Sequence, residues 1–429
     1  MAVEELERMC MFMGTPTISP SPVESAAMQQ TNWEAVRRQF RLSTDYIHLA
    51  SSQFIASHPE PVRLAIEAYR DEIDLNPVQC TLANENKQAQ RVREAAAGYL
   101  GMQDPNQIAL TDSTTMGLGL LYMGLTLTKD QEIVAPEDDY YSHLEAIRMC
   151  ARRTGASYRH FKLYDDLNTV TVDNIISAVM GAITDKTRVV GLSWVHSNTG
   201  LKLPIRHIGE EIEKLNQSRD EQAKVIFIVD GVHGFGIETE TFAELKCDFL
   251  VAGTHKWLYG PRGTGIIAGR DQAWQLIDPV IPTFTEVMGD VIQHKQRPER
   301  MTGKQMTPGG FHSLEHRWAL TDAFKFVNSI GKEQIKERVH ALNRYCKERL
   351  QRMDHVTLHT PVSERLSAGI IAFEVDGYST KQTVAHLLSH HIVCTAAPYY
   401  ISYARFTPGI YNTNEEIDEA LRVISDMKK

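Results

Sequence analysis

A lysine with unusual neighbours follows a short apolar run in this chain. Lys256 stands in the stretch VAGTHKWLYGPRGTG, residues 251–265, where glycine and proline turn signals come directly after it. His255 and Trp257 flank the lysine. An amine that is partly withdrawn from water has a lowered pKa and can form a Schiff base with an aldehyde. Because most lysines at strand ends are simply solvated, this interpretation needs support from other residues.

An acid and a histidine follow the preceding predicted strand. In VIFIVDGVHGFG, Asp230 comes directly after a hydrophobic run and His233 lies three residues further on. Taken alone, an aspartate in this place is typical of a helix cap or an Asx-turn. In an open α/β sheet, however, ligands bind outside the carboxyl ends of the strands, where loops carry the reactive groups. Next to Lys256, Asp230 becomes a natural partner for a protonated pyridine nitrogen.

A stretch suited to phosphate lies earlier in the chain. In ALTDSTTMGLGLL, residues 109–121, a predicted strand ends in a serine and threonine cluster that begins a helix. Hydroxyls and free N–H groups at a helix N-terminus bind phosphate, although a plain N-cap at Asp112 or Ser113 is the simpler reading of this feature alone. A phosphate site, an acid and a lysine, in this order along the chain, are together what pyridoxal phosphate requires of a protein.

The elements that position these residues predict an α/β fold. Short apolar runs alternate with stretches of helical composition, which indicates a mainly parallel sheet covered by helices, and the uninterrupted VIFIV suits a strand buried on both faces. We expect a large α/β domain over residues 31–309 and a small C-terminal α+β domain over 310–429. The predicted strands lie at 107–112, 132–137, 188–195, 224–231, 248–254, 263–269, 356–360 and 368–375, and the predicted helices at 59–73, 86–101 and within 313–353.

Composition restricts the partners. With 42% hydrophobic and 23% charged residues, the chain is typical of a globular protein. The net charge of −9 argues against general nucleic-acid binding and favours a small-molecule substrate. The six cysteines are scattered singly, so we expect reduced thiols in the cytoplasm and no metal site. Residues 1–30 contain neither a signal peptide nor a membrane anchor, and we expect them to form a flexible lead-in.

These motifs resemble the class V aminotransferase family, within fold type I of the pyridoxal phosphate enzymes. The likeness covers roughly residues 33–425 and depends on DGVHGFG, GTHKWLYGPRGTG and RFTPGIYNTNEEID. It is strongest to the branch of isopenicillin N epimerase-like and hercynylcysteine sulfoxide lyase-like enzymes. The resemblance implies the fold type I architecture, with a mainly parallel sheet of the seven-stranded type in the large domain, and pyridoxal 5′-phosphate as the cofactor.

The resemblance also implies roles for individual residues. Lys256 would carry the cofactor and shuttle the Cα proton, Asp230 would pair with the pyridine nitrogen, and His233 would lie near the phenolic oxygen. Arg405 would bind the substrate carboxylate. The residues implied to contact the cofactor also include Thr114, Thr115, Thr254 and His255 at the phosphate, Tyr140 or its neighbour Tyr141 stacked on the ring, Ser197 or Asn198 at a ring oxygen, and Thr307 reaching the phosphate of the neighbouring subunit in a homodimer.

The reaction is left open by these residues. The resemblance implies an enzyme acting at the Cα of an amino acid through an external aldimine and a quinonoid, in secondary metabolism. Transamination, Cα epimerisation and β-elimination all begin with the same deprotonation. Persulfide chemistry is disfavoured, because Cys394 matches a strand position and not the loop that carries the nucleophilic cysteine of desulfurases. A non-catalytic homologue and a cofactor-free lysine enzyme are the remaining alternatives.

Overall fold

A computed structural model describes residues 31–53, 58–296, 298 and 300–428. Chain contacts divide the protein into two units, Met1–Asn32 and Trp33–Lys429, and the description below concerns the second. The lead-in expected over residues 1–30 lies outside the described residues. Within the described residues, every helix is too short or too polar to cross a membrane.

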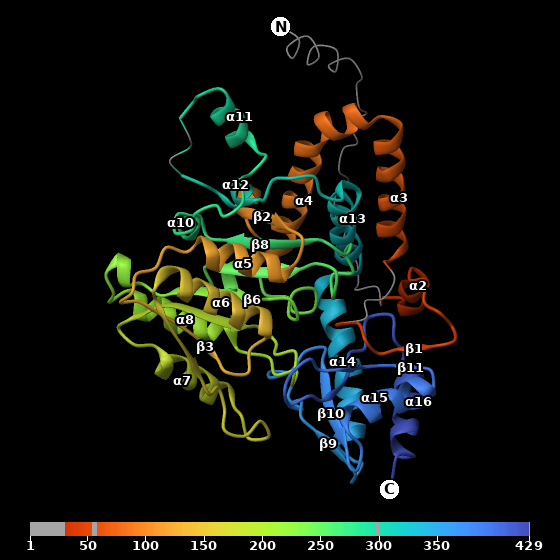
Figure 1. Ribbon diagram of the computed structural model, residues 1–429. Helices are drawn as coiled ribbons and strands as arrows, with labels where there is room; N and C mark the ends of the chain where they lie inside the picture. Colours follow the sequence, from red (N-terminus) through yellow and green to blue (C-terminus); the bar gives the residue numbers. More distant parts are fainter. Residues whose placement is uncertain (1–30, 54–57, 297, 299, 429) are drawn as a thin grey trace, which may run out of the picture. The chain divides into compact units, whose positions relative to one another are not determined.

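A seven-stranded sheet forms the centre of the second unit (Figure 1). Its strand order is β2-β8-β7-β6-β5-β3-β4, and every neighbouring pair is parallel except the two that involve β8. The predicted mainly parallel sheet is thereby confirmed. The strands are β2 (Ile108–Thr111), β3 (Glu132–Pro136), β4 (Ser157–Phe161), β5 (Thr187–Ser193), β6 (Ile226–Asp230), β7 (Phe249–Gly253) and β8 (Gly265–Gly269).

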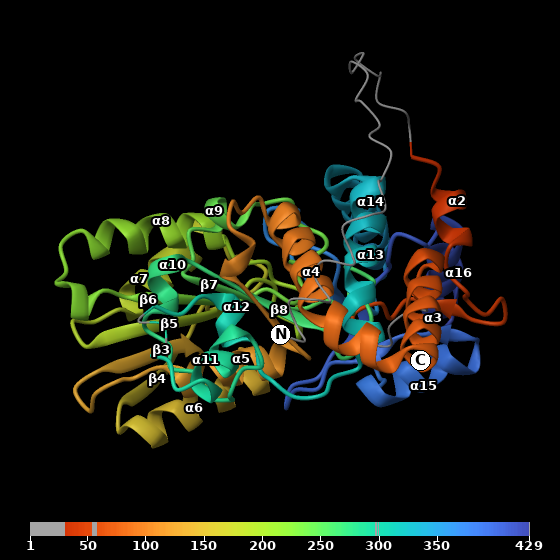
Figure 2. The ribbon, with the colours of Figure 1, turned by 90° about the horizontal axis from the view of Figure 1, so that it is seen from above.

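Each face of this sheet buries its own apolar cluster. Ile228 and Val251 pack on one face with α5 (Thr114–Gly124) and α6 (Tyr141–Thr154). Alternate strand residues such as Val229 pack on the other face with α7 (Val172–Ala182), α8 (Ile205–Asn216) and α9 (Phe242–Leu245). Figure 2 shows these two helical layers on either side of the strands. All five residues of β6 are therefore buried, as its continuous apolar run predicts.

Helices expected from periodicity are present near their predicted bounds. α3 (Glu60–Leu75) and α4 (Asn84–Leu100) precede the sheet, and α4 ends at Gly101, whose φ of 68° is the left-handed conformation that glycine tolerates. The helical stretch predicted within 313–353 forms two helices, α13 (Leu314–Ile330) and α14 (Lys332–Leu350), because Gly331 adopts a φ of 100°. The other described helices are α2 (Trp33–Arg38), α10 (Asp271–Trp274), α11 (Glu286–Ile292), α12 (Gly303–Met306), α15 (Thr380–Ser389) and α16 (Asn414–Ser425), with shorter turns at Gln79–Ala83, Pro105–Gln107 and Glu221–Ala223.

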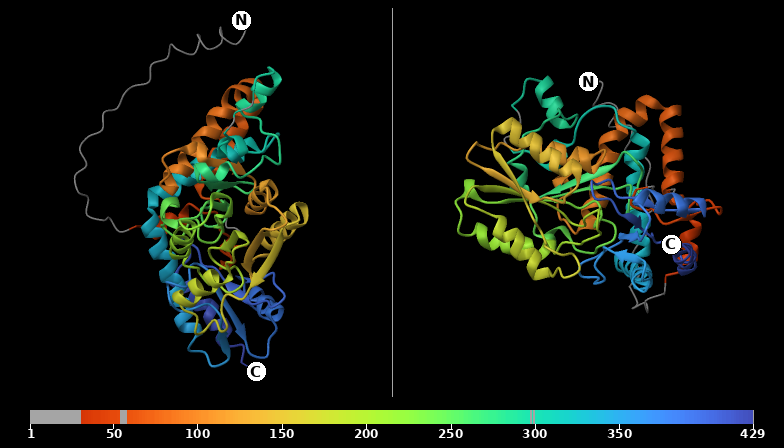
Figure 3. Two further views of the ribbon diagram at one scale, coloured as in Figure 1. Left: turned by 90° about the vertical axis from the view of Figure 1, so that its left-hand side faces the viewer. Right: turned by 60° about the horizontal axis from the view of Figure 1, so that its bottom comes forward.

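A second, antiparallel sheet is built from the C-terminal part of the chain. Its order is β12-β13-β10-β9, and it packs with α14, α15 and α16 (Figure 3). β9 (Val356–Leu358) and β10 (Ile371–Val375) were expected, whereas β12 (Thr395–Ala396) and β13 (Ala404–Phe406) are too short for a periodicity signal. This α+β arrangement agrees with the predicted texture after residue 310, and the boundary itself stays a prediction.

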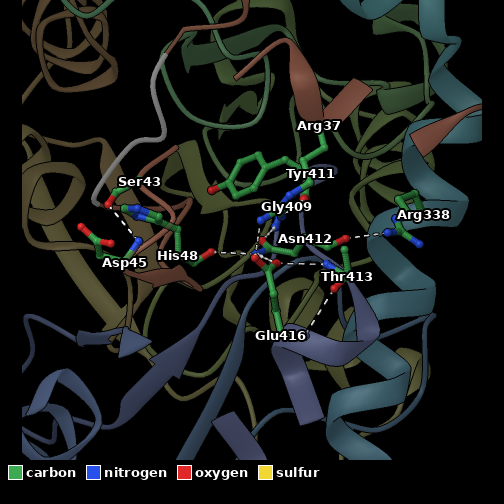
Figure 4. Close-up of polar contacts among 10 residues, drawn as sticks. All are labelled: Arg37, Ser43, Asp45, His48, Arg338, Gly409, Tyr411, Asn412, Thr413 and Glu416. Atoms are coloured by element: carbon green, nitrogen blue, oxygen red, sulfur yellow. Dashed lines mark hydrogen bonds and ion pairs between the residues drawn. The ribbon is translucent and has the colours of Figure 1, made fainter. Parts of the chain in front are cut away.

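The segment before α3 is tied to the C-terminal residues by polar contacts (Figure 4). Thr413 caps α16 and exchanges hydrogen bonds with Glu416, whose carboxylate also accepts from Arg37 at 2.6 Å. The Asn412 amide donates to the carbonyl oxygen of His48 at 2.9 Å. β1 (Ile47–His48) pairs in parallel with β11 (Ile392–Val393). The chain from β1 onward is therefore held beside β13, which carries Arg405.

One buried carboxylate links α14 to the loop that follows β6. The Glu238 side chain has no exposed area and lies 3.1 Å from Nζ of Lys202, 3.3 Å from Nζ of Lys336 and 2.8 Å from Nε2 of His340. Burial alone would raise its pKa, but the His340 hydrogen bond and the lysines lower the pKa of Glu238 from 4.5 to about 2. A folded pKa below the unfolded value adds stability above about pH 4.5, and this contribution disappears as the pH falls through about 2.

We therefore expect Glu238→Gln to lower the free energy of unfolding at neutral pH by about 3 kcal/mol. The difference from wild type should shrink as the pH falls below about 4.5. Chemical unfolding of the apo protein at several pH values measures both effects. Glu364→Gln, at an exposed carboxylate paired with Arg344, is the matched control and should change little. A pH-independent loss for Glu238→Gln would contradict this account.

Candidate active site

A cavity of about 350 Å³ lies at the carboxyl ends of β5 and β6, beside the N-terminus of α5. It contains most of the residues singled out from the sequence, as the rule for open α/β sheets predicts. The predicted residues that line it are Thr114, Thr115, Tyr140, Ser197, Asp230, His233, His255, Lys256 and Arg405.

The Lys256 amine is held by a short hydrogen-bond chain. Its Nζ lies 3.0 Å from Nε2 of His233, and Nε1 of the buried Trp257 donates to Nδ1 of the same ring at 3.4 Å. Burial, then the charges of Lys256 and Arg405, lower the pKa of His233 well below its usual value, so the ring is neutral. With Nδ1 accepting from Trp257, Nε2 carries the ring proton and donates it toward Nζ. Such an arrangement suits an uncharged, nucleophilic amine.

The electrostatics of the cavity shift the lysine toward the same uncharged state. Burial is the main cause that lowers the pKa of Lys256 to about 8, with Arg405 acting in the same direction and Asp230 opposing it. A primary amine attacks an aldehyde only when it is deprotonated. Near neutral pH, Lys256 therefore supplies far more free amine than an exposed lysine does.

Asp230 ends β6 and is only 3% exposed. One of its oxygens accepts a hydrogen bond from the Val232 amide at 3.0 Å, which orients the carboxylate in the turn after the strand. Burial raises the pKa of Asp230 to about 6, while His143 lowers it. A buried carboxylate with a raised pKa is stabilised when a cation comes to lie against it.

The first turn of α5 faces the cavity and has unused N–H groups, because the first amides of a helix lack intrahelical acceptors. Ser113 caps the helix by accepting from the Met116 amide at 3.1 Å. The Gly253 amide donates to Oγ1 of Thr114 at 2.7 Å, which joins β7 to this turn. Within the described residues, the buried Nδ1 of His255 has no hydrogen-bond partner. These groups together can receive an anion.

Arg405 is a buried cation whose recorded partners are all neutral. Its guanidinium donates to Oγ1 of Thr395 at 3.2 Å, to the Ser197 carbonyl oxygen at 2.5 Å and to Oε1 of Gln53 at 2.7 Å. Burial is the main cause that lowers its pKa to about 10. Among the residues that the structure describes, Arg405 has no carboxylate partner within ion-pair distance, so its charge is available for one from a ligand.

Four further residues named from the sequence lie outside the cavity wall. Tyr141 is 69% exposed, while Tyr140 lines the cavity. Nδ2 of Asn198 donates to the Ile401 carbonyl oxygen, while Ser197 lines the cavity and its Oγ lies 2.7 Å from the Tyr399 hydroxyl.

Thr254 and Thr307 are both buried and hydrogen-bonded elsewhere. Oγ1 of Thr254 lies 2.5 Å from Oγ1 of Thr264. Oγ1 of Thr307 accepts from Arg93 at 3.2 Å and from the Leu110 amide at 3.1 Å. Their predicted contacts with a phosphate therefore stay predictions.

Sequence reasoning missed several residues of the cavity wall. Gln53 is the most informative, because it contacts Arg405 from a segment far away in the chain. Its approach follows from the backbone: the Ser51 amide donates to the Thr407 carbonyl oxygen at 3.2 Å. Nothing in the local pattern of residues 47–53 signals that pairing. The other lining residues that were missed are Ser52, Ser142, Ser193, Val195, Val232 and Pro398, whereas Ser113 was considered from the sequence only as an N-cap.

The donor set fits pyridoxal phosphate. The buried Asp230 carboxylate suits a protonated pyridine nitrogen, the first turn of α5 with His255 suits the phosphate, and the amine of Lys256 suits the aldehyde. Since His255 has its pKa lowered to about 4 by burial and by Lys256, its ring is neutral, and the phosphate would be held mainly by N–H and O–H donors.

Comparison with known proteins agrees with this fit. Residues 56–419 match the family Aminotransferase class-V, and the chain belongs to this family. Isopenicillin N epimerase of Streptomyces clavuligerus is 25% identical over 409 residues, which cover 91% of this chain and 97% of that protein. A cysteine desulfurase of Serratia proteamaculans (strain 568) is 24% identical over 363 residues, which cover 81% of this chain and 84% of that protein.

Solved structures share the fold. An apo cysteine desulfurase from Thermococcus onnurineus NA1 superposes with a TM-score of 0.80 at 19% identity, covering 94% of this chain and 99% of its own. A C-DES mutant with glycine covalently linked to its PLP cofactor gives a TM-score of 0.79 at 22% identity, covering 91% and 99%. The predicted fold type I architecture is confirmed, and so is the dependence on pyridoxal phosphate that family membership brings.

Proposed function

We propose that this class V enzyme removes the Cα proton of an α-amino acid, with Lys256 as the base and Arg405 as the carboxylate-binding residue. One observation carries the proposal: a partly buried amine, a buried acid and a buried guanidinium without a carboxylate partner, among the residues described, converge on one cavity. When bound there, pyridoxal phosphate supplies an aldehyde that condenses with amines and a ring that takes up the electron pair left at Cα.

The chain's own residues have separate tasks in this proposal. Arg405 fixes the substrate carboxylate through paired N–H donors, which points Cα toward the amine of Lys256. Lys256 takes the proton, and the neutral His233 beside it holds the amine in place. Asp230 keeps the cofactor's ring nitrogen protonated. Thr114, Thr115 and His255 hold the phosphate, Tyr140 covers the ring, and Ser197 contacts a ring oxygen.

Among the possible outcomes, transamination, Cα epimerisation and β-elimination share this first step. The near full-length match to isopenicillin N epimerase favours chemistry at Cα on an unusual amino acid, in keeping with secondary metabolism. The neighbours named as desulfurases and a C-S lyase favour elimination from a sulfur-containing substrate as the second candidate.

Incubation of the holoenzyme with a panel of amino acids in deuterated water tests the proposal and separates its outcomes. Deuterium at Cα with inversion indicates epimerisation, oxo-acid formation indicates transamination, and pyruvate release indicates elimination. Lys256→Ala is the control, and it must slow all three by at least about a hundredfold. If no amino acid exchanges its Cα proton with solvent, the proposal is wrong.

A cysteine nucleophile has no place in this proposal. Cys394 is 3% exposed and does not line the cavity, and burial raises the pKa of its thiol to about 12. The other described cysteines are also buried, and Cys10 lies outside the described residues. We expect Cys394→Ala to keep the rate of the natural reaction within about twofold, with a modest loss of stability. A loss of turnover at unchanged cofactor content would instead support persulfide chemistry.

We also propose that the enzyme is a cytoplasmic homodimer. All five described cysteines are free, as in a reducing compartment. Exposed apolar side chains are frequent in the segments on both sides of Thr307, and exposed apolar surface of this kind is typical of an interface with another protein chain. These residues are Val280, Ile281, Phe284, Met288, Val291, Ile292 and Phe311.

Light scattering should give twice the chain mass for the wild type. Phe311→Asp, at a side chain that is 93% exposed, should shift the population to monomers and weaken cofactor retention, if Thr307 reaches the partner's phosphate. Tyr400→Asp, at an equally exposed aromatic outside these segments, is the control. A wild-type monomer with full activity would contradict the proposal.

A further inference from the structure

A buried aspartate joins the end of β5 to the start of α6. Oδ2 of Asp139 accepts from the Ser193 amide at 2.9 Å, and Oδ1 accepts from the Ser193 hydroxyl at 2.5 Å and from the Tyr140 amide at 2.6 Å. Its side chain has no exposed area. Because Tyr140 lines the cavity, this carboxylate fixes the backbone from which that ring projects.

The same aspartate pairs with a buried histidine on α6. Nδ1 of His143 lies 3.4 Å from Oδ2 of Asp139, and Nε2 lies 2.8 Å from the hydroxyl of Tyr122 on α5. Both members of the ion pair have no exposed side-chain area. A Cβ at Gly191 of β5 would lie 2.3 Å from the Tyr122 oxygen and 2.8 Å from Nε2 of His143. Because Gly191 has no side chain, the His143 ring and the Tyr122 hydroxyl can pack directly against β5.

The pair lies on the same face of the sheet as Asp230. Ser193 and Asp230 are register partners on the parallel strands β5 and β6, so their side chains point to the same face. Gly191 precedes Ser193 by two residues and faces the same side, where His143 packs. Ile228, two residues before Asp230, belongs to the cluster covered by α5 and α6. His143 therefore packs on the face of the sheet to which the Asp230 side chain also points.

We propose that Asp139 and His143 are positioning residues for the cofactor site, in which the imidazolium of His143 keeps Asp230 ionised and Asp139 keeps His143 protonated. The inference deepens the proposed function, because it assumes that Asp230 pairs with the cofactor's ring nitrogen. A second carboxylate near Asp230, left alone, would repel its negative charge and weaken that pairing. The positive charge of His143 on the same face of the sheet offsets this repulsion.

The surroundings of these groups shift their pKa values in the directions that the geometry implies. Burial alone would lower the pKa of His143, but the charge of Asp139, 3.4 Å away, together with that of Asp230, raises it above its usual value. His143 in turn is the largest influence that opposes the effect of burial on Asp230. His196, the other buried histidine beside Asp139, has a pKa lowered by burial and stays neutral. His143 is therefore the cation of this cluster.

A double-mutant cycle on cofactor binding tests the proposal. We expect His143→Gln, which removes the charge and can still bond to Tyr122, to raise the dissociation constant of pyridoxal phosphate about tenfold in apo protein that keeps its circular dichroism. In an Asp230→Asn background the same change should have less than a twofold effect. His340→Gln, at a buried histidine paired with Glu238 far along the chain, should leave the dissociation constant unchanged.

Each outcome has a definite meaning. An equal loss in both backgrounds, or no loss in the wild-type background, would overturn the inference and leave His143 a packing residue. An Asp230→Asn variant that binds the cofactor as wild type does would overturn the proposed role of Asp230 itself. If Asp230→Asn binds too weakly to titrate, borohydride trapping at a fixed cofactor concentration gives the same comparison. If His143→Gln does not fold, Tyr122→Phe serves in its place, with a smaller effect that again depends on Asp230.

Discussion

Replacing Lys256 by alanine is expected to remove the absorption band that the Lys256–pyridoxal phosphate Schiff base gives near the violet edge of the visible spectrum. The same change should slow exchange of the substrate's Cα proton by about 10²–10⁴-fold. Among the described residues that line the cavity, Lys256 is the one amine, and its lowered pKa and its contact with the neutral His233 prepare it to attack an aldehyde and to accept a proton. Absorption spectra and hydrogen exchange of an amino acid that the wild type accepts measure the two effects.

A matched lysine shows that the effect belongs to the site. Lys325 lies on α13 with a side chain that is 69% exposed, and Lys325→Ala should leave both the absorption and the exchange unchanged. Lys256→Arg keeps the positive charge but offers no primary amine, so it should behave as the alanine variant does. Retention of the absorption band in Lys256→Ala would show that another amine carries the cofactor.

Arg405→Gln is expected to lower kcat/KM by about 10²–10³-fold, chiefly through KM, while the apo protein loses little stability. The guanidinium is buried, and its described partners are neutral. Its desolvation therefore destabilises the free protein, and a ligand carboxylate that pairs with it offsets this penalty. Arg405→Lys should lose about tenfold, because it keeps the charge but not the two parallel donors. Steady-state kinetics and chemical unfolding measure these effects.

An arginine far from the cavity provides the control for this prediction. Arg422 on α16 is 57% exposed and pairs with Glu419 and Asp426, and Arg422→Gln should leave KM unchanged. Gln53→Ala gives an independent check, since its amide orients the guanidinium at 2.7 Å and should affect KM more than kcat. If Arg405→Gln lowers stability strongly and leaves KM unchanged, Arg405 is a structural residue.

The central strands of the sheet could be predicted from the sequence, because a strand that is buried on both faces is apolar at every position. β6 and β7 are continuous apolar runs since helices cover both sides of the sheet. β4 was missed because it forms the edge of the sheet, where four of its five residues remain partly or fully exposed and the apolar signal is lost. β1, β11 and β12 have two residues each, and their pairing is set by contacts between distant segments.

The site was predictable where its residues follow strands in sequence. Asp230 is the last residue of one strand, and Lys256 and Thr114 each lie three residues after the end of another strand of the same sheet, so topology alone brings them together. Gln53 and the Asp139–His143 pair were not predictable, because they reach the site through backbone pairing and helix packing. In the sequence, Asp139 and His143 at the beginning of α6 are indistinguishable from an ordinary helix cap. Their role depends on their packing against Gly191, which only the three-dimensional structure shows.

Borohydride reduction of the holoenzyme, followed by peptide mapping, tests the central claim most directly. The account predicts one pyridoxyl group, on the peptide that contains Lys256, and its absence when the protein is first stripped of cofactor. A pyridoxyl group on a different lysine, or none at all from protein saturated with pyridoxal phosphate, would contradict it.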